Sequence, residues 1–110
     1  MAGFASRAFG FGFAALALSF GSSAASAKVQ YSVAIGQMRY APLPANLHVG
    51  DTITFVNKDT LPHTVTARDN SFNLRLPPGQ SATLTLGKAG AFNFYCIYHP
   101  AMRGTLKVAA

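Results

Sequence analysis

Residues 92–108 read Phe-Asn-Phe-Tyr-Cys-Ile-Tyr-His-Pro-Ala-Met-Arg-Gly-Thr-Leu-Lys-Val, with two strand-like runs flanking a cluster of sulfur and imidazole side chains. In the first run Phe92, Phe94 and Cys96 occupy every second position, and Leu106 and Val108 do the same in the last. Successive side chains of a β-strand point to opposite faces, so this period of two predicts two half-buried strands. The stretch therefore predicts an all-β fold, with the Cys96 side chain inside it at a strand end.

The same alternation of apolar and polar residues recurs upstream. The other runs with this period are, in chain order, residues 29–35, 52–55, 64–68 and 81–86. Turn-forming sequences rich in Asn, Asp, Pro and Gly separate them, at residues 57–59, 77–79 and 87–90. We find no helical stripe in these segments, so the pattern predicts a small two-sheet β-sandwich.

The N-terminal stretch has a different composition and predicts a secretory signal peptide. Arg7 supplies a positive charge, residues 8–20 form an apolar run, and Ala25 and Ala27 form an Ala-x-Ala cleavage site. The run is shorter than the roughly 20 residues that span a bilayer, so we expect no stable membrane insertion after cleavage. We therefore expect residues 1–27 to be a signal peptide and residues 28–110 to form one exported domain.

The expected domain has a net positive charge. Without Arg7 the chain has eight basic and three acidic residues, a formal net charge of +5. There is no run of Lys and Arg and no nucleic-acid motif, so we expect no binding to nucleic acid. A basic surface favours acidic partners and affects the rate of association rather than the chemistry.

The single cysteine of the chain needs an explanation. Cys96 has no partner for an internal disulfide, and a free thiol would be prone to oxidation in an exported protein. Three interpretations are open: Cys96 is buried and inert, it joins a second chain, or it is a metal ligand.

The residues around Cys96 favour the metal ligand. His99 follows three residues later and Met102 three after that, while Pro100 is expected to end the strand pairing at this point. His63 lies on the inward side of its predicted strand and offers a second imidazole. One thiolate, two imidazoles and a weak thioether are the ligands of a blue-copper electron-transfer site.

Other chemistries fit these residues less well. Each of these side chains alone would be an ordinary core or surface residue. Methionine is a poor zinc ligand, and structural zinc sites usually contain paired Cys or His spacings that this chain lacks. A Cys/His nucleophile pair would need an orienting carboxylate, and the three Asp residues all lie in turn-like sequences. A four-ligand site leaves no open position for substrate, so we expect no enzymatic activity.

Four stretches of the sequence resemble the plastocyanin/azurin class of cupredoxins. They are residues 50–57, 62–65, 77–80 and 96–104. The short loop from Cys to Met is most similar to that of the amicyanins. The resemblance implies a Greek-key sandwich of about seven to eight strands and a monomeric, periplasmic carrier with one type 1 copper ion. It also implies that His99 lies at the surface among apolar residues, where redox donor and acceptor proteins dock transiently.

Three further residues carry specific expectations. Thr64 stands where the family commonly has Asn next to the ligand histidine, and its hydroxyl can still form hydrogen bonds. His48 is expected to be an exposed strand residue, and Met38 a core residue. Met38 and Met102 are the only methionines after residue 27. A copper-delivery protein, the alternative to an electron carrier, would be expected to have a motif richer in Met or His.

Overall fold

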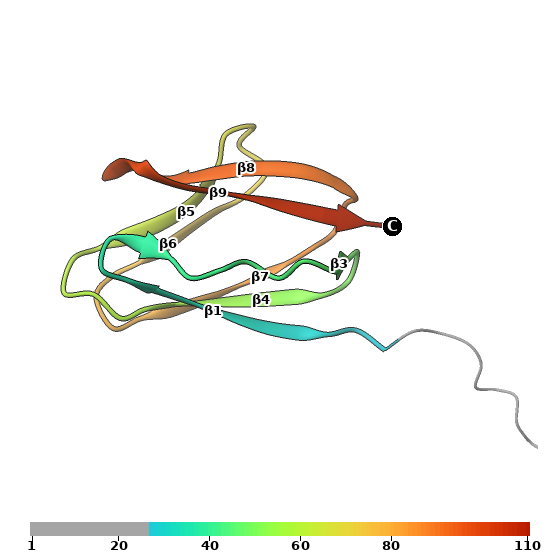
Figure 1. Ribbon diagram of the computed structural model, residues 1–110, viewed down its shortest axis with the longest axis horizontal. Helices are drawn as coiled ribbons and strands as arrows, with labels where there is room; N and C mark the ends of the chain where they lie inside the picture. Colours follow the sequence, from blue (N-terminus) through green and yellow to red (C-terminus); the bar gives the residue numbers. More distant parts are fainter. Residues whose placement is uncertain (1–26) are drawn as a thin grey trace, which may run out of the picture.

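Residues 27–110 form two β-sheets packed face to face, in the computed structural model that describes this part of the chain (Figure 1). The first sheet has the order β2 (Arg39–Tyr40), β1 (Gln30–Gly36), β4 (Thr52–Asn57), β7 (Ser81–Thr85). The second has the order β3 (Leu47–His48), β9 (His99–Ala109), β8 (Gly90–Cys96), β5 (His63–Ala67), β6 (Asn73–Leu76). The expected signal peptide lies outside the described residues, apart from Ala27.

The predicted all-β sandwich is confirmed, with nine strands in the described region. The strands that the alternation did not reveal are β2, β3 and β6, of which the first two have two residues each. A strand of two residues, such as β2 or β3, is too short to show an alternation of apolar and polar residues. No helix in the described part of the chain is long and apolar enough to cross a membrane.

The core lies between the two sheets and contains most of the side chains that the alternation placed inward, together with Leu47 of β3 and Leu76 of β6. Phe55 from the first sheet and Phe94 from the second meet edge to face, with ring centroids 6.1 Å apart. Tyr40 packs on Phe94 with centroids 4.9 Å apart. Edge-to-face contact is a favourable arrangement of aromatic rings. These three aromatic rings therefore pack the two sheets against each other.

Pro100 lies within β9, so the strand continues through it, but the pairing is interrupted at this point, as expected. Tyr95 pairs with Arg103, whereas the next residue, Cys96, pairs with His99, so a bulge separates the two pairs. Residues 100–102 have no partner in this register, and the missing N–H of the proline costs no ladder hydrogen bond. The bulge lets the chain turn sharply and still return as a strand.

Gly104 is required by close packing in the core. A Cβ atom at this position would lie 2.7 Å from Phe94 Cζ and 2.9 Å from Leu43 Cδ1. We expect Gly104→Ala to lower the free energy of unfolding by about 1–3 kcal/mol, the usual effect of overpacking. Gly36→Ala is the matched control, since a Cβ there meets nothing within 4 Å. Urea unfolding of both copper-free variants measures the difference, and equal stabilities would contradict the prediction.

Candidate metal centre

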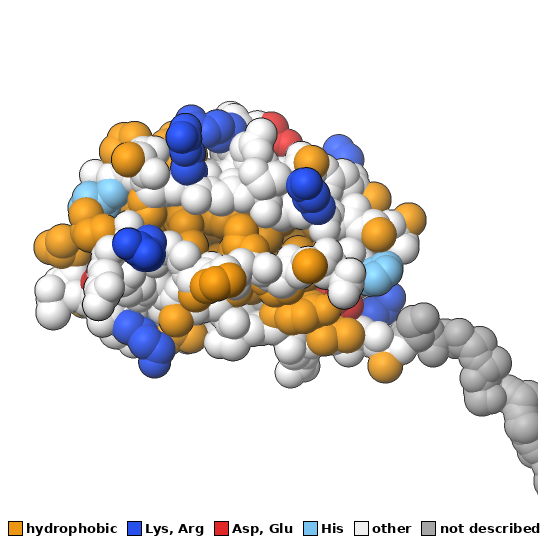
Figure 2. Space-filling view, in the orientation of Figure 1, with side chains coloured by type: hydrophobic (Ala, Val, Ile, Leu, Met, Phe, Trp, Pro, Cys, Tyr) orange, Lys and Arg blue, Asp and Glu red, His pale blue; other side chains and the backbone are white. Residues whose placement is uncertain are grey.

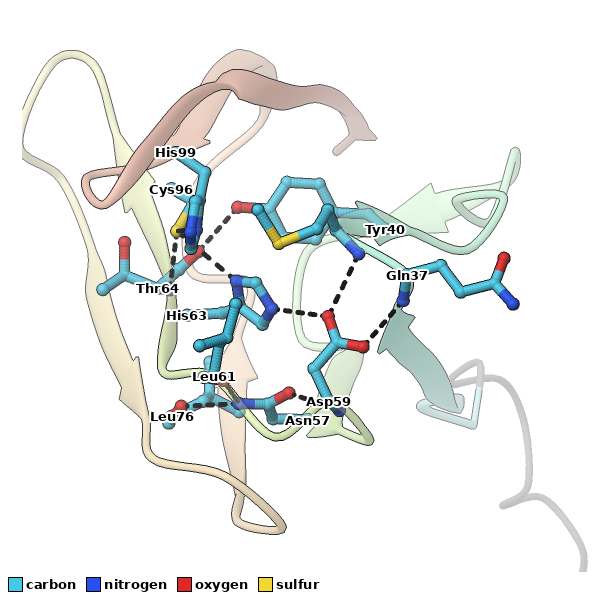
Figure 3. A network of polar contacts seen from close by, with 11 residues as sticks. Gln37, Tyr40, Asn57, Asp59, Leu61, His63, Thr64, Leu76, Cys96 and His99 are labelled. Carbon is cyan, nitrogen blue, oxygen red and sulfur yellow. Dashed lines mark hydrogen bonds and ion pairs between the residues drawn. The ribbon is translucent and has the colours of Figure 1, made fainter.

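Three potential metal ligands converge at the end of the sandwich where β8 turns into β9 (Figure 3). His63 begins β5, Cys96 ends β8 and His99 begins β9 after a two-residue turn. The Cys96 Sγ atom lies 3.7 Å from His63 Nδ1 and 3.6 Å from His99 Nδ1. His63 and Cys96 are fully buried, and His99 is partly exposed. The structure thus brings together three residues that the sequence predicted as ligands.

The spacing of these donor atoms fits a single metal ion. An ion about 2.0 Å from each nitrogen and about 2.3 Å from the sulfur would hold N and S about 3.5–3.8 Å apart. The observed separations of 3.6 and 3.7 Å agree with this value. Met102, the predicted thioether ligand, is buried in the core cluster and is the last unpaired residue of the bulge in β9. Thiolate, imidazole and thioether together suit copper.

Asp59 holds the far side of the His63 ring. Its Oδ2 atom lies 2.7 Å from His63 Nε2 and also accepts a hydrogen bond from the Met38 amide, while Oδ1 accepts one from the Gln37 amide. The expectation that no carboxylate orients these residues is therefore wrong. A carboxylate only accepts hydrogen bonds, so His63 carries its proton on Nε2. The unprotonated Nδ1 is left facing Cys96, ready to bind a metal.

The charge state of Asp59 is set by the same contacts. Hydrogen bonds from the Met38 amide, from His63 and from the Gln37 amide hold the pKa of the Asp59 carboxyl below its usual range. Gln37 and Met38 form the β1–β2 turn with unfavourable positive φ values of 54° and 62°. The hydrogen bonds that their amides donate to the Asp59 carboxylate stabilise this strained turn. Met38 is 42% exposed in this turn, so its expected place in the core is wrong.

Asn57 anchors the chain that leads from β4 to His63. Its buried side-chain amide donates to the carbonyls of Leu61 and Leu76, at 2.8 and 2.9 Å. Its Oδ1 accepts a hydrogen bond from the Asp59 amide. Each polar atom of the amide thus has a partner, as burial requires. The sequence placed Asn57 and Asp59 in a turn but gave no sign that their side chains face the site.

Thr64 braces the two ligand segments. Its Oγ1 accepts a hydrogen bond from the Ile97 amide at 3.0 Å, and its own amide lies 3.4 Å from Cys96 Sγ. The hydroxyl therefore serves as a hydrogen-bond partner at the position where the family commonly has Asn, as the sequence suggested. The Thr64 amide is thus directed at the sulfur of the candidate ligand Cys96.

We expect Thr64→Val to destabilise the copper-free protein by about 1–3 kcal/mol, because the Ile97 amide loses its partner. Val keeps the shape of Thr but has no acceptor. Urea unfolding measures the loss, and Thr64→Ser, which keeps the hydroxyl, is the control. If Thr64→Val and Thr64→Ser are equally stable, the hydrogen bond to Ile97 does not brace the site.

Tyr40 lies behind the site and was not predicted from sequence. Its hydroxyl donates to the Thr64 carbonyl at 2.6 Å. Burial, and then the Coulombic effect of the nearby Cys96, raise the pKa of Tyr40, so its hydroxyl stays neutral. His48 lies at the other end of the second sheet, exposed on β3, as expected for a residue that is not a ligand.

The fold and this site together define a small β-sandwich metalloprotein with a buried thiolate and two imidazoles. Residues 8–108 match the family model described as "Cupredoxin-like domain". The chain belongs to this cupredoxin-like family. Copper is the metal that its donor set fits.

Relatives and solved structures agree with this assignment. The chain is 32% identical to an amicyanin of Paracoccus denitrificans over 82 residues, which cover 69% of this chain and 63% of the relative. It is 32% identical to a plastocyanin of Prochlorothrix hollandica over 93 residues, which cover 69% of this chain and 70% of the relative. The match thus spans less than two thirds of the amicyanin's length.

Two solved structures show the same fold. A reduced amicyanin variant superposes with a TM-score of 0.60 at 31% identity, covering 70% of this chain and 79% of the other. A purple cupredoxin from Nitrosopumilus maritimus gives a TM-score of 0.63 at 27% identity, covering 71% of this chain and 98% of the other. The resemblance to amicyanins and plastocyanins is confirmed.

Proposed function

We propose that this protein is a periplasmic carrier of single electrons, with one copper ion held by His63, Cys96, His99 and Met102. The observation that carries the proposal is the convergence of the Cys96 sulfur with two imidazole nitrogens at 3.6 and 3.7 Å. When bound, copper supplies one-electron chemistry by cycling between Cu(II) and Cu(I). The protein supplies a mixed ligand set in which thiolate and thioether suit Cu(I) and imidazole suits both states.

The surroundings of the ligands support a fixed geometry. Asp59 orients the His63 ring and Thr64 ties the segment after Cys96 to β5. Ligands held by packed strands move little when an electron arrives. Small movement favours fast transfer, so a rigid frame is useful in a carrier.

The surface around His99 is suited to transient contact with redox partners. Large apolar side chains are exposed in the two loops beside it: Leu61 is 47%, Ile97 37% and Tyr98 49% exposed. Figure 2 shows hydrophobic side chains gathered beside histidine at that end of the molecule. Exposed apolar patches mark interaction sites. We propose that donor and acceptor proteins dock here in turn, on a monomer.

The same arguments bear on enzymatic activity and location. Four protein ligands leave no position for a substrate, so we expect no enzymatic activity. The proposed location rests on the signal-peptide pattern in residues 1–27.

The test is the absorption and EPR spectrum of purified protein loaded with Cu(II). We expect an intense blue band and narrow copper hyperfine splitting, both abolished in Cys96→Ser. Reductive and oxidative titration should then show reversible uptake of one electron per copper. His99→Gln should change both spectra, whereas His48→Gln, the same change at an exposed histidine outside the site, should leave them as in the unmodified protein.

A different result would favour another function. A colourless protein that binds only Cu(I) and does not cycle would contradict the carrier and favour copper delivery. Tight zinc binding without Cu(II) colour would point to a structural site.

A further inference from the structure

A row of hydrogen bonds runs from the segment after Cys96 to the edge of the second sheet. It begins at the Ile97 amide, which donates to Thr64 Oγ1 at 3.0 Å. The Thr66 Oγ1 atom lies 2.9 Å from Thr64 Oγ1 and 2.7 Å from Asn73 Oδ1. Thr64 is fully buried, Thr66 is partly exposed and Asn73 is exposed on the edge strand β6. We call Thr64, Thr66 and Asn73 the polar chain, because they join the metal centre to the surface.

The strands themselves hold the polar chain in place. Thr64 and Thr66 flank Val65 on β5, and because Val65 packs in the core, the two threonines point away from it. Thr66 pairs in register with Asn73 on β6. Side chains of directly paired residues are close enough to bond to each other. The polar chain is therefore positioned by paired strands rather than by flexible loops.

The protons of the two hydroxyl groups can be assigned by counting donors and acceptors. A hydroxyl has one proton to donate, and the amide oxygen of Asn73 only accepts. The Thr66 hydroxyl therefore donates to Asn73 Oδ1, which leaves its oxygen to accept the Thr64 proton. The opposite direction would leave the proton of the buried Thr64 hydroxyl without an acceptor among residues 27–110. The Thr64 oxygen thus directs its proton outward and a lone pair to the Ile97 amide.

We propose that Thr66 and Asn73 are positioning residues for the metal centre, acting through the direction of the Thr64 hydroxyl. Hydrogen bonds in such a row polarise one another, so the outer bonds strengthen the bond from Ile97 to Thr64. That bond ties the segment after Cys96 to β5. The Thr64 amide lies 3.4 Å from Cys96 Sγ, so a shift of this segment changes the surroundings of the sulfur. The proposal rests on the proposed copper site for its redox consequence.

A similar pair of residues in the same sheet provides a matched control. Thr105 Oγ1 donates to Asn93 Oδ1 at 2.7 Å, and the two residues pair in register between β9 and β8. This pair has the same chemistry as Thr66 and Asn73. Within residues 27–110, however, no hydrogen bond joins it to Thr64. Thr105→Val is therefore the control for Thr66→Val.

The first measurement is amide hydrogen exchange of the copper-free protein, followed by ¹⁵N NMR. We expect Thr66→Val and Asn73→Leu to speed exchange of the Ile97 amide about three- to tenfold, because its acceptor loses its fixed orientation. Thr66→Ser keeps the hydroxyl and should restore the original rate. Thr105→Val should change the rate less than about twofold. The amide spectrum of each variant shows whether it is folded.

The second measurement is the reduction potential of the copper-loaded protein. Hydrogen bonding around the cysteine sulfur tunes this potential, and a hydrogen bond to the sulfur favours the more electron-rich Cu(I) state. We expect Thr66→Val to reduce the preference for Cu(I) over Cu(II) about threefold, a fall of about 30 mV for one electron. Asn73→Leu should lower the potential as well. Thr105→Val should change the preference less than about 1.5-fold.

Several results would overturn the proposal. These are an unchanged Ile97 exchange rate in Thr66→Val and Asn73→Leu, an equal change in Thr105→Val, and no rescue by Thr66→Ser. Faster exchange with an unchanged potential would also overturn it, since the polar chain would then be purely structural. If the protein bound no copper, the proposed carrier function would fail, whereas the exchange rates would still show whether Thr66 and Asn73 hold the Ile97 amide.

Discussion

Replacing Asp59 with asparagine is expected to weaken Cu(II) binding roughly 10- to 100-fold, the usual effect of losing a hydrogen-bond partner of a metal ligand. The carboxylate has two acceptor oxygens for the His63 ring and the Gln37 and Met38 amides. An asparagine side chain has one oxygen and one NH₂ group, so its NH₂ must face at least one of these donors. The His63 ring then loses the partner that fixes its proton on Nε2.

The measurement is a competition titration of Cu(II) against a chelator of known affinity. Asp69→Asn is the matched control, because Asp69 undergoes the same chemical change in an exposed turn. A second readout is the ¹⁵N NMR spectrum of the His63 ring in copper-free protein. We expect a single Nε2-protonated form in the unmodified protein and a tautomer mixture in Asp59→Asn. Unchanged affinity together with an unchanged tautomer would refute the role given to Asp59.

Replacing Asn57 with alanine is expected to lower the free energy of unfolding by about 3 kcal/mol or more. The variant leaves the Leu61 and Leu76 carbonyls and the Asp59 amide without their partner. Each buried polar group left unsatisfied costs about 1–3 kcal/mol. Because Asn57 anchors the segment before His63, copper affinity should fall as well.

Urea unfolding of the copper-free protein measures this loss. Asn46→Ala is the control, since the Asn46 side chain is exposed. Asn57→Asp separates hydrogen bonding from volume, because it keeps the size of the side chain but has no donor for the two carbonyls. We expect Asn57→Asp to be destabilised as well. If Asn57→Asp matches the unmodified protein, the two donated bonds do not matter.

Much of the fold could be predicted from local pattern. The runs at 29–35, 81–86 and 92–96 became strands, because a period of two buries one face of each strand. The β2 and β3 pairings and the position of Pro100 within β9 could not be predicted. They depend on which strands meet and in what register, and a bulge leaves no local signature in sequence.

The sequence by itself determined the chemistry of this protein: which donor atoms exist, their spacing after Cys96, and the basic charge balance. The tertiary structure decided everything that depends on contacts between distant segments. It placed Asp59 against both His63 and the β1–β2 turn, and it joined Thr64 to Asn73 through Thr66. Donor type is a property of one residue, whereas orientation, burial and partner choice follow from the packing of the two sheets against each other.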